Sequence, residues 1–128
     1  MLLFIFSLVM SACSEQSQVN PHVEIDGYEE SEINEDIPVP ADAEVSEVEF
    51  SNPNIKEGKK YTLENIGGEQ GLYPPLNYFD EMKNWGWEEL KDERKGHVHF
   101  FRKEDQIISI EISEDYVNLY EMEEGFEF

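Results

Sequence analysis

The stretch QIISIEISEDYVNLYEM, residues 106–122, decides the fold. In its first half, isoleucines at 108, 110 and 112 alternate with Ser109 and Glu111, a pattern that places apolar side chains on one face of a strand and polar side chains on the other. Its second half, 116–122, alternates in the same way. The short polar segment between the halves suits a hairpin connection. The stretch therefore predicts two antiparallel strands with one buried face.

The segment before these strands, Pro75–Trp85, is typical of a helix. A proline suits the first helical turn, where its missing N–H leaves no hydrogen bond unmade. Gly86 follows where a left-handed residue ends many helices, and Trp87 can then fold back onto the last turn. Four apolar residues recur at nearly helical spacing and are predicted to form one buried stripe: Leu76, Phe79, Met82 and Trp85.

Further strand-like runs flank the helix, and they define the expected architecture. They are Glu44–Phe50, Lys59–Ile66, Trp87–Leu90 and His97–Arg102. The glycine-rich segment 67–71 is expected to be a flexible connection. We predict an α+β fold with two strands, one helix, and then an antiparallel meander of three to four strands packed on the helix. Residues 44–128 are expected to form a single small domain.

The segment that precedes this domain, residues 13–43, differs in composition. It carries acidic residues but no lysine or arginine, and its apolar residues are scattered singly. Such a segment buries too little apolar surface to offset the entropy lost on folding. We predict that residues 13–43 are a disordered, acidic tether.

The first twelve residues form a different kind of segment. An apolar run, Leu2–Met10, contains no charged residue and only one serine, and it leads to Ser11, Ala12 and the only cysteine, Cys13. A secretory signal needs an apolar core of about 7–15 residues followed by small side chains. A transmembrane helix needs about 20 apolar residues, which is longer than this run. An ordinary secretion signal cut after Ala12 would want a small residue where Met10 stands.

The junction Met10-Ser11-Ala12-Cys13 resembles the lipobox of bacterial lipoproteins. The resemblance covers the signal region alone. It implies that residues 1–12 are a signal peptide and that Cys13 receives a diacylglyceryl group and becomes the first residue of the mature chain. The expected location is the extracytoplasmic face of the cell membrane, where two acyl chains are enough for stable attachment. Cys13 is then a lipid attachment site and takes no part in disulfide or thiol chemistry.

Charge limits the possible partners. The chain has 30 acidic and 9 basic residues, a net charge of −21, and every basic residue lies between Lys56 and Lys103. Binding to nucleic acid depends on lysine and arginine neutralising phosphates, so nucleic acid is excluded as a partner. Cationic partners, such as divalent metals or basic peptides, are permitted. The alternative is that the acidity only keeps an exported protein soluble. Besides the membrane, the expected partners are a basic exported protein or a cell-wall component.

Two histidines are the candidate metal ligands. His97 and His99 are two residues apart, so on a strand they would project from one face and could hold a Zn²⁺ ion together with a carboxylate. The alternative is that both are ordinary sheet residues, since no third ligand is marked by spacing. A metal-binding protein or metal-dependent enzyme using these two histidines is therefore the rival hypothesis, and we expect neither a metal nor another cofactor.

Two tyrosines are the candidate binding patch. Tyr116 and Tyr120 lie on the strand face opposite Val117 and Leu119, where they could be exposed to a protein or glycan partner. The alternative is that they belong to the core. Adjacent carboxylates are frequent, but acid–base catalysis needs two carboxyls in different environments. We therefore expect a binding or interaction domain that is not an enzyme.

Overall fold

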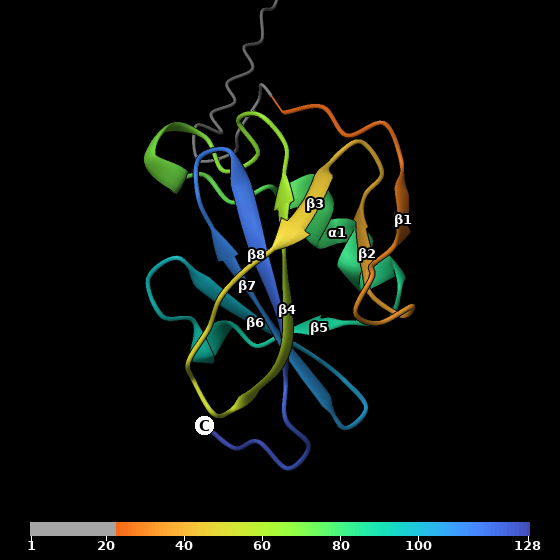
Figure 1. The fold of residues 1–128 in the computed structure, drawn as a ribbon. Coiled ribbons are helices and arrows are strands. Elements are labelled where there is room, and N and C mark those ends of the chain that lie inside the picture. The colour runs from red at the N-terminus through yellow and green to blue at the C-terminus, as the bar shows by residue number, and fades with distance from the viewer. Residues whose placement is uncertain (1–22) are drawn as a thin grey trace, which may run out of the picture.

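The computed structural model describes residues 23–128, and this part of the chain is an α+β domain (Figure 1). Its strands and helices follow one another along the chain as β1 (Tyr28–Glu30), β2 (Pro38–Pro40), β3 (Glu44–Glu47), β4 (Ile55–Thr62), the 3-10 helix η1 (Glu69–Gly71), α1 (Leu76–Asn84), β5 (Glu88–Glu89), the 3-10 helix η2 (Lys91–Glu93), β6 (Val98–Lys103), β7 (Gln106–Ile112) and β8 (Tyr116–Met122).

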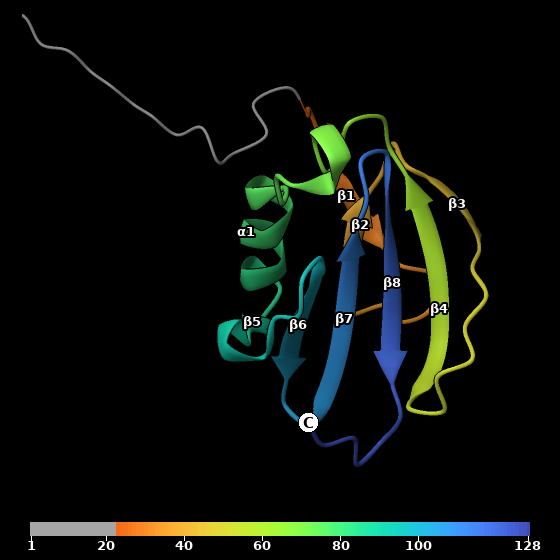
Figure 2. The ribbon, with the colours of Figure 1, turned by 90° about the vertical axis from the view of Figure 1, so that its left-hand side faces the viewer.

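Six strands form one antiparallel sheet in the order β3-β4-β8-β7-β6-β5. The predicted α+β class and the meander from β5 to β8 are confirmed. Strands β3 and β4 precede the helix in the chain, and β4 pairs along its length with β8, the last strand of the meander. Figure 2 looks onto one face of this sheet, with β1 and β2 behind it and α1 at the side of β6. The strand count is larger than predicted, because β1 and β2 form a separate two-stranded sheet.

Helix α1 ends as its sequence predicts. Gly86 has a φ of 100°, a conformation that glycine adopts without strain. The Trp87 N–H donates to the Met82 carbonyl at 3.0 Å, and the Gly86 N–H donates to the Lys83 carbonyl at 2.9 Å. These two bonds satisfy the last carbonyls of the helix in the Schellman arrangement. The turn delivers Trp87 into the core, where it is 2% exposed.

The predicted apolar stripe of the helix is wrong at one end. Leu76 is 44% exposed, and Tyr78 is fully buried in its place. The reason is a specific polar contact: the Tyr78 hydroxyl donates to the Pro38 carbonyl at 2.9 Å. A tyrosine can be buried when its hydroxyl has a partner, and β2 supplies that partner.

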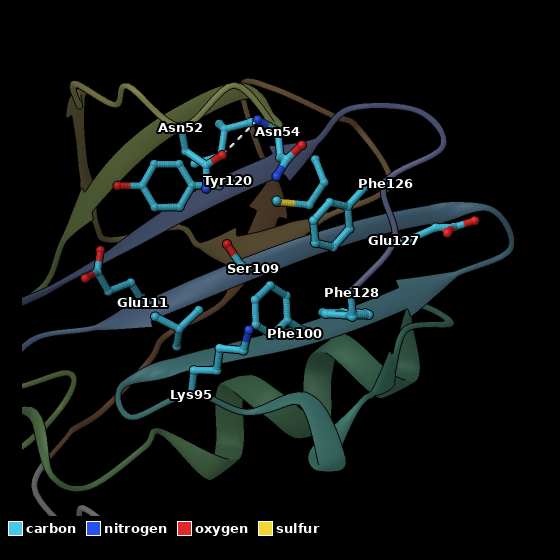
Figure 3. A pocket seen from close by; sticks show the side chains of 13 residues that line it. Asn52, Asn54, Lys95, Phe100, Ser109, Glu111, Tyr120, Phe126, Glu127 and Phe128 are labelled. Atoms are coloured by element: carbon cyan, nitrogen blue, oxygen red, sulfur yellow. Dashed lines mark hydrogen bonds between the residues drawn. The ribbon is translucent and has the colours of Figure 1, made fainter.

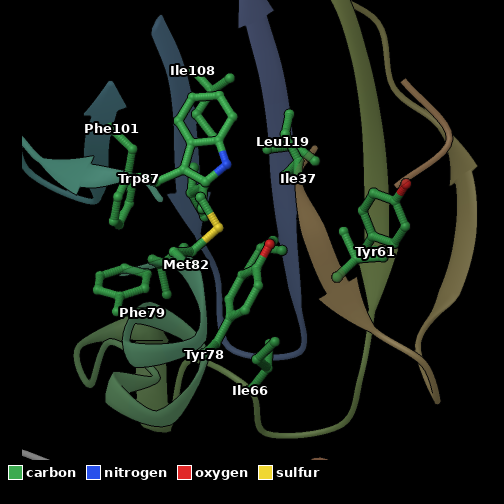
Figure 4. Packing of buried hydrophobic residues seen from close by; sticks show 14 of the residues in the cluster. Ile37, Tyr61, Ile66, Tyr78, Phe79, Met82, Trp87, Phe101, Ile108 and Leu119 are labelled. Carbon is green, nitrogen blue, oxygen red and sulfur yellow. The ribbon is translucent and has the colours of Figure 1, made fainter. Parts of the chain in front are cut away.

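The predicted boundary between tether and domain also needs correction, since residues 23–43 belong to the fold. Ile37 and Val39 are 0% and 1% exposed and pack in the core with α1 and the large sheet (Figure 4). The Trp87 indole N–H donates to the Asp36 carbonyl at 2.8 Å. This segment folds with few apolar residues because its backbone carbonyls also accept hydrogen bonds from buried side chains of α1 and of the turn that follows it. The remainder of the predicted signal and tether, residues 1–22, lies outside the described part.

The segment predicted to be a flexible connection, residues 67–71, is closely packed. A Cβ atom at Gly67 would lie 2.1 Å from the Ser113 carbonyl oxygen, so the backbones of the two segments approach too closely for any side chain. The Gly67 N–H donates to the Glu114 carbonyl at 3.0 Å. This loop is therefore fastened to the β7–β8 turn. Of the helices between residues 23 and 128, none has the length and apolarity to cross a membrane.

Candidate functional site: a groove on the open face of the sheet

The two faces of the large sheet have different environments. Ile108, Ile110 and Leu119 point to the face that α1 and β2 cover, and all three are fully buried. The residues between them point to the other face, which neither α1 nor β2 covers (Figure 2). We call this the open face. The alternation that predicted these strands therefore also determines which side chains are presented to a partner.

Strand register arranges the open face in two rows that run across the sheet. One row contains Val98, Glu111, Asn118 and Lys60, from β6, β7, β8 and β4 in turn. The next row contains Phe100, Ser109, Tyr120 and Gly58. The Tyr120 ring lies over Gly58, where an added Cβ atom would be only 2.6 Å from the ring. One row is thus mainly polar, and the other carries the aromatic rings of Phe100 and Tyr120.

Two segments outside the strands rise above this face and turn it into a groove of about 460 Å³ (Figure 3). On one side is the turn before β4, where Asn52 accepts a hydrogen bond from the Asn54 N–H at 2.8 Å. On the other side is the chain after β8. The lining residues are Asn52, Asn54, Ile55, Lys95, Val98, Phe100, Ser109, Glu111, Tyr120, Met122, Phe126, Glu127 and Phe128.

An aromatic cluster forms much of the wall. The rings of Phe100 and Phe128 meet edge to face with centroids 4.9 Å apart, and Phe126 meets Phe128 in the same way at 5.0 Å. Phe128 remains 46% exposed, whereas Phe100 beneath it is 8% exposed. Across the groove, Phe50 packs edge to face on Tyr120 at 6.0 Å. Such ring pairs favour offset or perpendicular geometry.

The polar row supplies a carboxylate beside these rings. Glu111 accepts a hydrogen bond from the Asn118 side-chain N–H at 3.2 Å. The pKa of Tyr120 is raised, first by burial of the phenol and then by the negative charge of Glu111. The ammonium group of Lys60 lies 4.3 Å from the centre of the Tyr116 ring, a distance typical of a cation–π contact. The open face therefore already holds one cation against an aromatic ring.

The predicted binding residues are placed as follows. Tyr116 and Tyr120 are both half-buried on the open face, opposite Val117 and Leu119 as the alternation predicts. Tyr120 lines the groove, while Tyr116 lies outside it and packs under Lys60. Sequence reasoning missed Phe100, Glu111 and Phe128. A signal for Phe128 was available, since Phe126 and Phe128 alternate with acidic residues after the last strand.

The two candidate metal ligands have separate partners. The Nδ1 atom of His97 is 3.0 Å from the Gly71 carbonyl oxygen, and that of His99 is 3.2 Å from a Glu89 carboxylate oxygen. His99 is 3% exposed on the covered face, in edge contact with the Phe79 ring. Within residues 23–128, no group of three or more His, Cys, Asp or Glu side chains could hold a metal ion. This geometry gives the metal hypothesis no support.

The contact between Glu89 and His99 should make stability depend on pH. The hydrogen bond from His99 lowers the pKa of Glu89 below the ordinary value of 4.5, against the opposing effect of burial. A carboxyl with a lowered folded-state pKa contributes its stability above the unfolded-state pKa and loses it as pH falls through the folded-state pKa. Glu89→Gln should therefore destabilise the domain by on the order of 1 kcal/mol at pH 7.

The gap in unfolding free energy between wild type and Glu89→Gln should narrow as pH falls below that ordinary value. Urea denaturation at a series of pH values measures it. Glu88→Gln is the matched control, because Glu88 is exposed on the neighbouring position of β5. A gap that stays constant with pH, or an equal gap for Glu88→Gln, would show that the Glu89 charge is not stabilised by His99.

Comparison with known proteins adds no relationship: the chain matches no family model, no curated protein and no solved structure. Cys13, the predicted lipid attachment site, lies outside the described part of the chain.

Proposed function

We propose that this chain is an exported lipoprotein, anchored to the membrane through Cys13, whose domain binds a partner and catalyses no reaction. The groove on the open face is the observation that carries the binding role. It is concave and largely apolar, with a few polar groups among aromatic side chains, which is the usual character of a binding site.

The support for anchoring is the lipobox-like junction at Met10–Cys13. Residues 14–22 separate Cys13 from the described domain, and a chain of that length reaches at most about 32 Å when fully extended. The described chain begins at one end of the domain, and its C-terminus lies at the other end (Figure 2). Phe126 and Phe128, which line the groove, therefore lie at the end of the domain away from the point where the chain from Cys13 enters it.

The support for binding without catalysis is the nature of the polar groups. Acid–base catalysis needs carboxyls whose pKa values are pushed apart by their environments. Glu111 and Glu127 in the groove have no histidine, cysteine or lysine within hydrogen-bonding or ion-pair distance among residues 23–128. The groove therefore offers contacts for recognition and lacks an activated nucleophile.

Site-specific photo-crosslinking in the producing cells tests the binding role. A photoreactive residue replacing Phe128 should give a discrete adduct, because position 128 is half-exposed at the groove wall. The same residue replacing Glu69, in η1 and outside the groove, is the control and should not give that adduct. The same set of adducts from both positions, or none from position 128, would contradict a partner at this groove.

A further inference from the structure

The carboxylate of Glu111, one of two in the groove, forms no ion pair with the described residues. Glu111 is only partly buried, and its carboxylate accepts a hydrogen bond from Asn118. Lys60 is in the same row but places its ammonium group over Tyr116, and Lys95 lines the groove without an ion pair. The carboxylate is therefore available to a charged ligand.

The same row also contains a buried hydrogen-bond acceptor without a partner within residues 23–128. Asn118 is 8% exposed, and its Oδ1 atom is buried with no hydrogen-bond partner among the described residues. Its amide N–H is already used by Glu111. A buried acceptor without a donor is uncommon in folded proteins and calls for an explanation. Asn118 does not line the groove, so a ligand meets this row at Glu111, where an N–H donor is favoured and an anionic group is opposed.

The aromatic wall adds a second requirement. Phe100, Phe126 and Phe128 form a continuous apolar surface, with Phe128 and Phe126 at the end of the groove opposite Glu111 and Phe100 between (Figure 3). A guanidinium group stacks on aromatic faces and carries five N–H donors, and its aliphatic stem covers apolar surface. The net charge of −21 favours the approach of a cation and opposes that of an anion.

We propose that the groove binds a basic, partly apolar peptide segment of another exported protein. An arginine of that segment places its guanidinium group at Glu111 and its aliphatic stem along Phe100, and neighbouring apolar side chains of the segment cover Phe126 and Phe128 at the other end of the groove (Figure 3). This inference rests on the proposed binding function and names its ligand class. Lys95 also lines the groove, beside Phe100, and its positive charge opposes the bound cation (Figure 3).

The test uses the full-length chain in nonionic detergent micelles. Binding is measured by fluorescence anisotropy of three labelled hexapeptides in which leucine alternates with arginine, glutamine or glutamate. The arginine peptide should bind, and the other two should bind at least about tenfold more weakly. Glu111→Gln should lower the affinity for the arginine peptide by roughly tenfold, because the substitution removes a negative charge beside the bound cation. Lys95→Gln should raise that affinity by about twofold to fivefold, because it removes a positive charge that repels the cation.

Glu69→Gln is the matched control. It changes the net charge by the same amount outside the groove and should alter affinity by less than about twofold. Equal weakening by Glu111→Gln and Glu69→Gln would overturn the inference in favour of diffuse attraction to the acidic surface. Preferred binding of the glutamine or glutamate peptide, lost in Phe128→Ala, would overturn the ligand class while leaving a binding groove. Absence of binding by all three peptides would overturn this inference alone, since the crosslinking from position 128 decides the proposed function separately.

Discussion

A chain that begins at Glu44 should fail to fold, whereas one that begins at Val23 should unfold cooperatively. Starting at Glu44 removes three fully buried residues, Ile37, Pro38 and Val39. Burial of an aliphatic side chain of this size contributes about 1.5–3 kcal/mol. The lost contribution is therefore a large part of the 5–15 kcal/mol by which a domain is usually stable.

The shorter chain also loses two hydrogen-bond acceptors in the core. The Trp87 indole N–H and the Tyr78 hydroxyl donate to the carbonyls of Asp36 and Pro38. Each donor left without a partner costs about 1–3 kcal/mol if it stays buried. Trp87 and Tyr78 are among the largest fully buried side chains, so their exposure would open the space between α1 and the large sheet (Figure 4).

Circular dichroism and urea denaturation of the two chains measure this difference. We expect a single sigmoidal transition for the chain from Val23 and none for the chain from Glu44. Equal denaturation midpoints would mean that β1 and β2 are dispensable, and the sequence-based boundary at Glu44 would then stand as the true edge of the folding unit.

The strands and helix that carry their own pattern could be predicted from the sequence. Strand β7 alternates cleanly over Ile108, Ile110 and Ile112, and α1 has a proline before its first turn and Gly86 after its last. In each of these segments the local signal and the tertiary environment agree, because the same residues that favour the element also form its buried face.

The N-terminal hairpin could not be predicted, because its signal is not local. Residues 28–40 contain few apolar side chains and many acidic ones, which is the composition of a disordered segment. These residues are held in place by contacts with residues far along the chain. The buried Trp87 and Tyr78 side chains each donate a hydrogen bond, to the carbonyls of Asp36 and Pro38 respectively. The local sequence pattern does not indicate these two long-range hydrogen bonds.

The groove could be predicted only in part. Alternation in β8 correctly places Tyr120 on the face opposite Leu119, and the same rule places Glu111 opposite Ile110. The groove itself depends on the chain after β8, where Phe128 returns to cover Phe100. The path of the chain after β8 depends on tertiary packing. Knowing which strand residues share a face is therefore not enough to predict that this face is concave.

Replacing Cys13 should have an all-or-none effect on attachment to the membrane. A diacylglyceryl group buries many methylenes in the bilayer at about 0.8 kcal/mol each, which gives stable anchoring. Cys13 is the only cysteine in the chain, so no second thiol can accept the group. Cys13→Ser should therefore remain unmodified and leave the membrane fraction, while the conservative control Ser14→Ala should behave as wild type.

Metabolic labelling with a fatty-acid analogue, followed by fractionation and mass spectrometry of the chain's N-terminus, tests membrane anchoring most directly. We expect label in the wild-type chain, recovery with the membranes, a mature N-terminus at Cys13, and no label in Cys13→Ser. An intact wild-type polypeptide recovered from the cytosol, with Met1 still present and the Cys13 thiol free, would contradict it.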